Sequence, residues 1–165
     1  MTRASFLAAA LVLSACGLRP IYSGGSTGPV AQALEMVEVG PIPGRAGWLV
    51  RTALEDRLGN GGGTEPRYRL DIELDDDITG YGVRRDNAVT RERRTLRARY
   101  RLVDVERGEI VLDATAGSDA GVDVVSSEYA TVAAEQTALE RLAVELADQI
   151  AARIALYASR GGEPR

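Results

Sequence analysis

The sequence predicts a two-layer α/β sandwich, in which a four-stranded mixed sheet carries two helices on one face in the order β-α-β-β-β-α. Two observations lead to this fold class. Three segments in the middle of the chain alternate apolar and charged residues with a period of two, which is typical of strands that bury one face. Residues 45–58 and 129–157 instead repeat apolar residues at helical spacing, so each segment has one stripe to bury. A sheet with one apolar face and two helices with one stripe each pack most economically as two layers.

The first strand is predicted at residues 34–39, LEMVEV, and the two prolines of GPIPG end it. The helix that follows, 45–58, stops at the glycine run 59–63, because glycine readily adopts the left-handed conformation that ends helices. Trp48 lies away from the centre of the apolar stripe of this helix. We expect its indole to pack at the edge of the core; the alternative is an exposed contact residue.

The other three strands are predicted at RYRLDIELD (67–75), RRTLRARYRLVD (93–104) and EIVLDATAG (109–117). The turn VERGE between the last two contains Gly108, which can adopt a positive φ, so these two segments are predicted to form a hairpin. In the third segment Ile110 shares the apolar face with Leu112. The acidic run ELDDDITG, 73–80, does not have the spacing of a calcium-binding loop and is interpreted as a strand end that turns polar.

The last predicted element is long, because residues 129–157 contain neither Pro nor Gly and carry a continuous apolar stripe. Ser126 or Ser127 is placed to cap the start of this helix. The strand–helix–strand order at the start of the domain implies a right-handed crossover, and the later strands form an antiparallel meander. Residues 160–165, RGGEPR, are expected to be a disordered tail.

The composition excludes several kinds of catalytic site. The chain contains no His, so it has no Ser-His-Asp triad, no His general base and no His metal ligand. Its single Cys cannot form an internal disulfide or a multi-thiolate metal site. No catalytic residue, metal or cofactor is predicted, and we expect the protein not to be an enzyme. A formal charge of −4 does not suggest a protein that coats nucleic acid.

The single Cys follows an apolar run near the start of the chain. Residues 4–13 are too few to span a bilayer, which takes ~20 residues, but they suit the hydrophobic region of a secretory signal. The motif LSAC at 13–16 resembles the lipobox of bacterial lipoproteins. That resemblance implies that Cys16 is acylated and becomes the first residue of the mature chain, since several acyl chains give a stable membrane anchor. The alternative is an ordinary signal peptide with an incidental Cys.

The chain is therefore divided into a signal peptide (1–15), a flexible Gly/Ser/Pro-rich tether (16–33), a single α/β domain (34–159) and a disordered tail (160–165). In the familiar sorting rule for lipoproteins, Asp directly after the acylated Cys retains the protein at the inner membrane. This chain has Gly17 there, which favours the outer membrane, with the domain facing the periplasm.

Basic residues are concentrated in one stretch. All twenty basic residues are Arg, and eight of them lie within 84–101 beside only two acids, a local charge of +6. Arg97, Arg99 and Arg101 fall on the solvent face of a predicted strand, where acids of neighbouring strands can pair with them for ~0.2–1 kcal/mol each. Five others lie in or near the connection between strands, where guanidinium groups can capture phosphate; the alternative for them is ordinary solvated charge. The five candidate anion-binding residues are Arg84, Arg85, Arg91, Arg93 and Arg94.

The order of these features resembles one family, the lipopolysaccharide-assembly lipoproteins LptE. The resemblance rests on ACGLRPIY (15–22), VEVGPIPGRAGWLVRTALEDRL (37–58), YRLDIEL (68–74), the Arg-rich hairpin, and SSEYATVAAEQTALERLAVELADQI (126–150). It implies a non-enzymatic protein that sits as a plug inside the LptD outer-membrane β-barrel and assists delivery of lipopolysaccharide to the cell surface. The basic hairpin would then bind the phosphates of lipid A.

Two other classes of protein remain open on the sequence. A periplasmic enzyme or solute-binding lipoprotein would need a ligand pocket, for which the sequence has no signature. An envelope scaffold would need the anchor and the domain but no contact with lipopolysaccharide.

Overall fold

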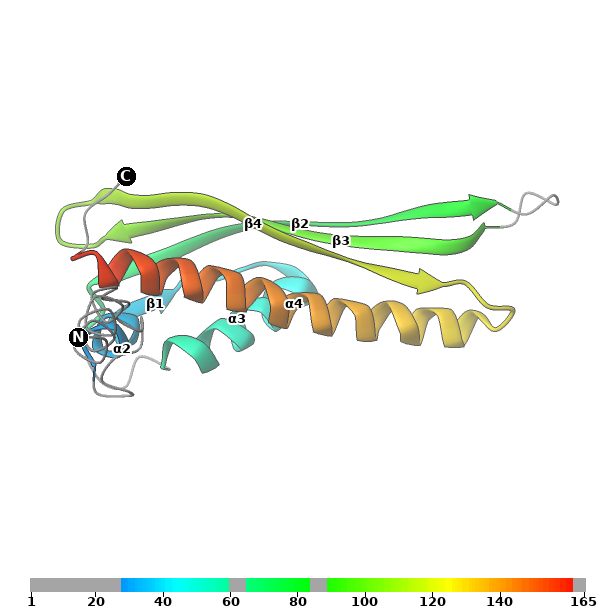
Figure 1. Cartoon of the computed structure of the whole chain (residues 1–165), viewed down its shortest axis with the longest axis horizontal. Helices are drawn as coiled ribbons and strands as arrows, with labels where there is room; N and C mark the ends of the chain where they lie inside the picture. Colours follow the sequence, from blue (N-terminus) through cyan, green and yellow to red (C-terminus); the bar gives the residue numbers. More distant parts are fainter. Residues whose placement is uncertain (1–27, 60–64, 84–88, 162–165) are drawn as a thin grey trace, which may run out of the picture.

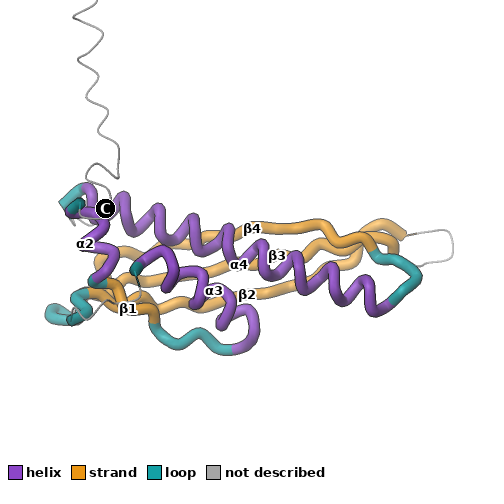
Figure 2. The backbone as a smooth tube through the Cα atoms, turned by 90° about the horizontal axis from the view of Figure 1, so that it is seen from below, coloured by secondary structure: helices purple, strands orange, loops and turns teal. Residues whose placement is uncertain are grey.

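The computed structural model describes residues 28–59, 65–83 and 89–161. In chain order its helices and strands are α2 (Pro29–Glu35), β1 (Val37–Val39), α3 (Gly44–Leu58), β2 (Tyr68–Val83), β3 (Val89–Asp104), β4 (Glu109–Asp123) and α4 (Glu128–Ser159). The sheet has the order β1-β2-β3-β4, with β1 parallel to β2 and the other neighbours antiparallel. The long helix α4 runs along one face of the sheet, and α3 packs beside it on the same side (Figure 1; Figure 2). The predicted two-layer mixed α/β fold is therefore confirmed.

The ends of the elements follow from local sequence. Gly59 adopts a φ of 87° and caps α3, as the glycine run predicts. Gly108 adopts a φ of 68° in the turn between β3 and β4, and the predicted hairpin forms there. Ser127 is the N-cap of α4, where its Oγ accepts a hydrogen bond of 3.4 Å from the backbone N–H of Ala130.

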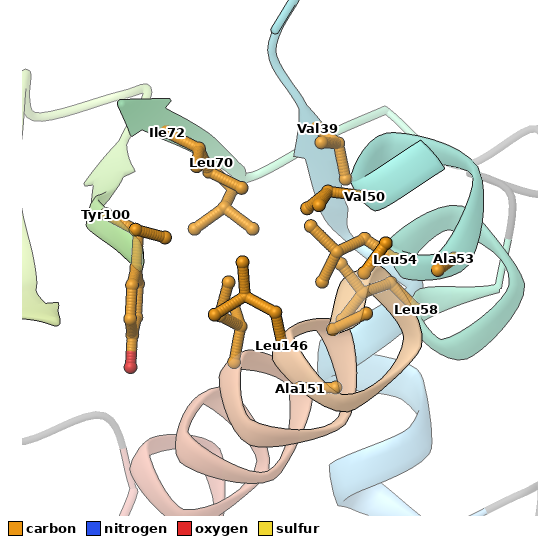
Figure 3. Close-up of a cluster of buried hydrophobic side chains, with 14 of the residues drawn as sticks. Val39, Val50, Ala53, Leu54, Leu58, Leu70, Ile72, Tyr100, Leu146 and Ala151 are labelled. Carbon is orange, nitrogen blue, oxygen red and sulfur yellow. The ribbon is translucent and has the colours of Figure 1, made fainter. Parts of the chain in front are cut away.

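The hydrophobic core lies between the sheet and the helices (Figure 3). Sheet residues Leu70 and Leu102 face α4, which contributes Leu142, Leu146 and Ile150; all five are essentially inaccessible to solvent. Burying a Leu or Ile side chain stabilises the fold by about 1.5–3 kcal/mol. These contacts therefore fix α4 on the sheet, and α4 in turn holds α3.

Followed from its C-terminal end towards its N-terminal end, β3 has Leu96 as its last buried large side chain. Strands β2, β3 and β4 and helix α4 all continue well past the level of Leu96. We call residues 77–83 of β2, 89–95 of β3, 119–123 of β4 and 128–137 of α4 the distal arm, and the rest of the domain the base. Figure 1 shows the three strands and the start of α4 projecting past α3 in this region.

The start of the domain differs from the sequence prediction. Residues 29–35 form the short helix α2, where the sequence suggested the end of a tether followed by a strand from residue 34. Only Val37–Val39 form the strand. Val30 and Leu34 are buried in the core, and Pro29 stands at the start of α2, where its fixed φ suits a first helical turn. Residues 1–27, with the predicted signal peptide, Cys16 and Gly17, lie outside the described residues.

Three other predictions are corrected. Trp48 is 64% exposed, so it is an exposed residue and does not pack at the core edge. Ile110 is 53% exposed, because a shift in register between Leu102 and Val103 moves it off the apolar face. The acidic run 73–80 is not a strand end, since β2 continues through it to Val83 and pairs with β3 throughout.

Candidate functional site: the charged outer face of the sheet

The face of the sheet that points away from the helices carries an unusual charge pattern. Alternate residues of the central strand β3 place five guanidinium groups in one line, which we call the arginine column. The register sets acidic residues of β2 and β4 beside this column, as in the row Asp71, Arg101 and Asp113. The column consists of Arg91, Arg93, Arg97, Arg99 and Arg101.

In the base the arginine column is largely neutralised by its neighbours. Arg99 donates two hydrogen bonds to Asp113, at 3.2 and 2.8 Å, and these lower the pKa of the Asp113 carboxyl. Arg101 donates to Glu73 across the β2–β3 pair at 2.5 Å. The predicted cross-strand pairing is confirmed for these two residues. Arg97 has no carboxylate within ion-pair distance in the described part of the chain, and the residue opposite it on β4 is Gly117.

In the distal arm the column is also paired with acids, and it is as open to solvent as Arg99 of the base, whose side chain is 58% exposed. Arg91 pairs with Asp123 at 3.0 Å, and Arg93 lies 3.8 Å from Asp119. The Arg93 guanidinium also lies 5.4 Å from the centre of the Tyr81 ring, within the range of a cation–π contact. The arginine side chains remain 63% and 58% exposed, and exposed ion pairs contribute little free energy. A competing anion can therefore reach both guanidinium groups.

Arg94 occupies the opposite face of the sheet. Its Nε and Nη2 donate to the two oxygens of Asp76, at 2.8 and 2.6 Å, and its Nη1 donates to the backbone carbonyl of Glu135 at 3.0 Å. Only 12% of its side chain is exposed, and the hydrogen bonds to Asp76 raise the pKa of Arg94. These contacts connect β2, β3 and the start of α4.

The structure thus separates the five predicted anion-binding residues. Arg91 and Arg93 lie together on the outer face, Arg94 lies on the inner face, and Arg84 and Arg85 fall outside the described residues. The predicted strand 93–104 already includes Arg93 and Arg94 at its start, and β3 begins four residues earlier, at Val89, so that Arg91 also belongs to the strand and not to a connection. With β3 extended, their odd and even positions decide which face each one occupies.

Other contacts of this region form only in three dimensions and leave no signal in the sequence. Tyr81 supports Arg93 because β2 extends farther than its apolar alternation suggested. On the inner face Glu92 lies beside Glu135 of α4, and its Oε2 is buried without a hydrogen-bond partner in the described structure. Burial and the neighbouring Glu135 carboxylate raise the pKa of Glu92.

Two hollows lie beside the arginine column. One, of about 770 Å³, is lined by Arg97, Arg99 and Gln149 among others, and one of about 540 Å³ lies on the outer face between β2 and β3, lined by Asp77, Tyr81 and Arg93 among others. A third hollow, of about 310 Å³, lies in the base, where α2 and the end of α4 meet the sheet. Its wall contains Asp104, which is 2% exposed and lies 3.8 Å from Arg67.

Neither a metal centre nor a membrane-spanning helix is found in the described residues. No group of three or more metal-ligating side chains occurs within 28–59, 65–83 and 89–161. None of the helices in these ranges is both long and apolar enough to cross a bilayer.

Comparison with known proteins gives a consistent result. Residues 33–154 match the family model LptE, described as lipopolysaccharide-assembly. No curated protein sequence matches the chain. A crystal structure described as a lipoprotein from Caulobacter crescentus CB15 is similar, with a TM-score of 0.65 and 26% identity over 79% of this chain and 96% of that one.

More distant solved structures share the fold. Rare lipoprotein B from Shewanella oneidensis has a TM-score of 0.58 at 12% identity, over 75% of this chain and 95% of that one. A minor lipoprotein from Acinetobacter baumannii has a TM-score of 0.52 at 16% identity, over 73% and 90%.

Proposed function

This chain belongs to the LptE lipopolysaccharide-assembly family, and from that premise we propose that it is an outer-membrane lipoprotein that works as the plug of an LptD-like β-barrel. In this role it binds its partners and catalyses no reaction. The long domain stands in the barrel lumen, the N-terminal lipid holds it at the membrane, and lipopolysaccharide is handed on beside it.

The exposed distal part of the arginine column is the observation that supports contact with lipopolysaccharide. Arg91 and Arg93 are solvent-accessible and held only by weak exposed ion pairs. A phosphate of lipid A can replace these carboxylates, because charge-assisted hydrogen bonds from guanidinium to phosphate are strong and often two-pronged. Arg84 and Arg85, which precede β3 in the sequence, remain proposed phosphate-binding residues.

Arg94 has a different role in this proposal. Its guanidinium already makes three hydrogen bonds, to Asp76 and to the Glu135 carbonyl. A phosphate would have to break contacts that are mostly shielded from water. We assign Arg94 to holding α4 against the sheet.

Membrane anchoring rests on Cys16. A Cys16→Ser variant is expected to remain an unprocessed precursor that takes up no labelled fatty acid, because the acylated sulfur is lost. Gel mobility and fatty-acid labelling of whole cells measure this. Normal processing and labelling of the variant would contradict the anchor.

The partner is tested by gentle detergent extraction of outer membranes from cells that carry a tagged chain. A one-to-one complex with an LptD-like barrel is expected, since a stable interface of this kind buries at least ~1,200 Å². Depleting the chain should also impair maturation of the barrel. If only the free chain is extracted and the barrel matures normally without it, the plug role is wrong.

The hollow of about 310 Å³ in the base supports a second candidate, a solute-binding lipoprotein. Its volume lies at the lower end of the range of small-molecule sites, and it combines apolar walls with the buried Asp104. The extraction experiment separates the two functions, because a solute-binding protein does not co-purify with a barrel. An envelope scaffold that has no contact with lipopolysaccharide is distinguished by lipopolysaccharide binding itself.

A further inference from the structure

One long edge of the sheet is open. β1 pairs only with Tyr68–Leu70 of β2, and the backbone N–H of Gly40 adds one bond to the Leu70 carbonyl. β2 runs on to Val83, and its other side is taken by β3. Figure 2 shows the distal part of β2 as the outermost strand on its side of the sheet. An open edge of this kind is a template for a further strand.

The direction of the exposed backbone groups follows from the bonds at the start of β2. The Tyr68 N–H and the Leu70 carbonyl both bond towards β1, so even-numbered residues direct their backbone groups to this edge. The register between β2 and β3 is unbroken, so the same alternation continues along the strand. Beyond the pairing with β1, the edge-facing residues between 74 and 80, from the end of the base into the distal arm, are Leu74, Asp76, Ile78 and Gly80. Within the described residues their backbone groups have no partner on that side.

The opposite edge of the sheet, formed by β4, makes hydrogen bonds with side chains of α4. On β4 the N–H and carbonyl of Gly117 bond to the side-chain amide of Gln149, at 3.4 and 3.3 Å. The Ser118 hydroxyl donates to Glu145 at 2.6 Å. Side chains of α4 therefore cover the middle of the β4 edge, at Gly117 and Ser118, and no such contact is found for the β2 edge in the described part of the chain.

The side chains along the open edge specify what can pair with it. On the outer face Asp75 and Asp77 have no ion-pair partner in the described part of the chain, although the Thr79 hydroxyl donates to Asp77 at 2.7 Å. On the inner face Leu74 is half-buried and Ile78 is 40% exposed. Directly opposite residues of neighbouring strands interact through side chains on the same face, and opposite charges there are favourable.

A second copy of this chain is disfavoured in the register centred on this edge. Antiparallel pairing of two β2 edges about Asp76 would set Asp75 of each copy against Asp77 of the other. Like charges directly opposite each other destabilise a strand pair.

We propose that the distal edge of β2, centred on Leu74–Gly80, accepts an extended polypeptide segment whose side chains alternate between basic and apolar. The segment bonds to the free backbone groups, sets its Arg or Lys side chains beside Asp75 and Asp77, and sets its apolar side chains beside Leu74 and Ile78. This is recognition by strand addition, in which the main chain supplies affinity and alternate side chains supply specificity. The proposal goes beyond the plug function, since it does not depend on which protein supplies the segment.

The test uses the purified full chain and a synthetic nine-residue peptide that alternates Arg and Val. Binding is measured by fluorescence anisotropy of the labelled peptide, and the bound region is mapped by hydrogen–deuterium exchange. We expect saturable binding and slower exchange within 72–82. The Asp75→Asn/Asp77→Asn variant should bind about fivefold more weakly, as expected for the loss of two exposed charge pairs.

Proline variants test the backbone bonds directly. Ile78→Pro removes one edge-facing N–H from β2 and should abolish binding, since Pro is tolerated at an edge but cannot donate. Thr115→Pro removes an edge-facing N–H from β4 and should bind as the unchanged protein does. Circular dichroism establishes that both variants fold.

Three results would overturn the proposal. One is no binding of the Arg-Val peptide up to about 1 mM. Another is equal binding of an Arg-Val peptide whose backbone nitrogens are methylated, because simple charge attraction would then suffice. The third is self-association of the Asp75→Asn/Asp77→Asn variant while the unchanged protein binds no peptide, which would mean that the acids only protect the edge.

Discussion

The base and the distal arm are parts of one sheet, but they are held together by different interactions. In the base, Leu54, Leu142 and Leu146 are fully shielded from water. Among the described residues of the arm, only Ala120, Val122 and Thr131 are buried, while Tyr129 is 86% exposed. The arm relies on strand pairing and on ion pairs. The buried side chains that stabilise the fold are therefore concentrated in the base. The arm contributes little to the core, so its side chains can be charged and exposed for binding.

The largest expected difference comes from truncating core side chains. Leu146→Ala should lower the free energy of unfolding by about 2–5 kcal/mol, because it leaves a cavity between α4 and the sheet. Ile78→Ala in the arm should change it by about 0.5 kcal/mol or less, since Ile78 is 40% exposed. Urea unfolding of both variants measures the contrast. Equal losses would mean that the arm is part of the core.

A smaller effect is expected from the ion pairs. Arg94→Ala should destabilise the protein by about 1–3 kcal/mol, because Asp76 then loses both hydrogen bonds in a partly shielded position. Arg99→Ala removes a two-bond pair that is exposed, and it should cost about 1 kcal/mol or less. Thermal melting of both variants gives the comparison. If Arg99→Ala proves the more damaging, the assigned role of Arg94 is wrong.

The smallest expected effect depends on pH. The pKa of Glu92 is raised in the folded state, so the neutral carboxyl favours folding at low pH and this contribution is lost as pH rises through the folded-state pKa. Glu92→Gln should therefore be more stable than the unchanged protein at pH 8, by about 1 kcal/mol at most, and equal to it near pH 4. Unfolding curves at the two pH values measure this. A variant that is less stable at pH 8 would show that the ionised carboxylate is needed.

Most of the fold could be predicted from the sequence, because the strands and helices of the base bury one face and carry the matching period. Leu70 and Ile72 of β2 and Leu142 of α4 illustrate this. The strands of the arm extend farther than the sequence predicts, because this apolar signal is missing there. These strands bury few side chains, so the residues near Asp76 and Arg91 are charged on both faces and do not have the apolar alternation of a strand. Pairing with β3 decides the structure there, and single-strand patterns do not contain that information.

The positive charge of the site could be predicted from the sequence, but the full arrangement of its side chains on the sheet could not. The cluster of Arg residues is visible in the sequence, and the period of the predicted strand 93–104 already places Arg93 and Arg94 on opposite faces, whereas the inclusion of Arg91 depends on where β3 begins. The covering of the β4 edge by Gln149 depends on the path of α4 over the sheet. Trp48 was placed wrongly because an aromatic residue beside a helical stripe can lie on either side of the core boundary.

The most direct test of the account is lipopolysaccharide binding by two matched double variants, Arg91→Gln/Arg93→Gln in the arm and Arg99→Gln/Arg101→Gln in the base. Each removes two arginines from the same column of β3. Binding of purified lipopolysaccharide and melting temperature are measured for both at low salt, where exposed charge contacts are least screened. The arm variant should lose binding about tenfold or more and keep its melting temperature, whereas the base variant should keep binding and melt a few degrees lower. Equal binding by the two variants would contradict the account.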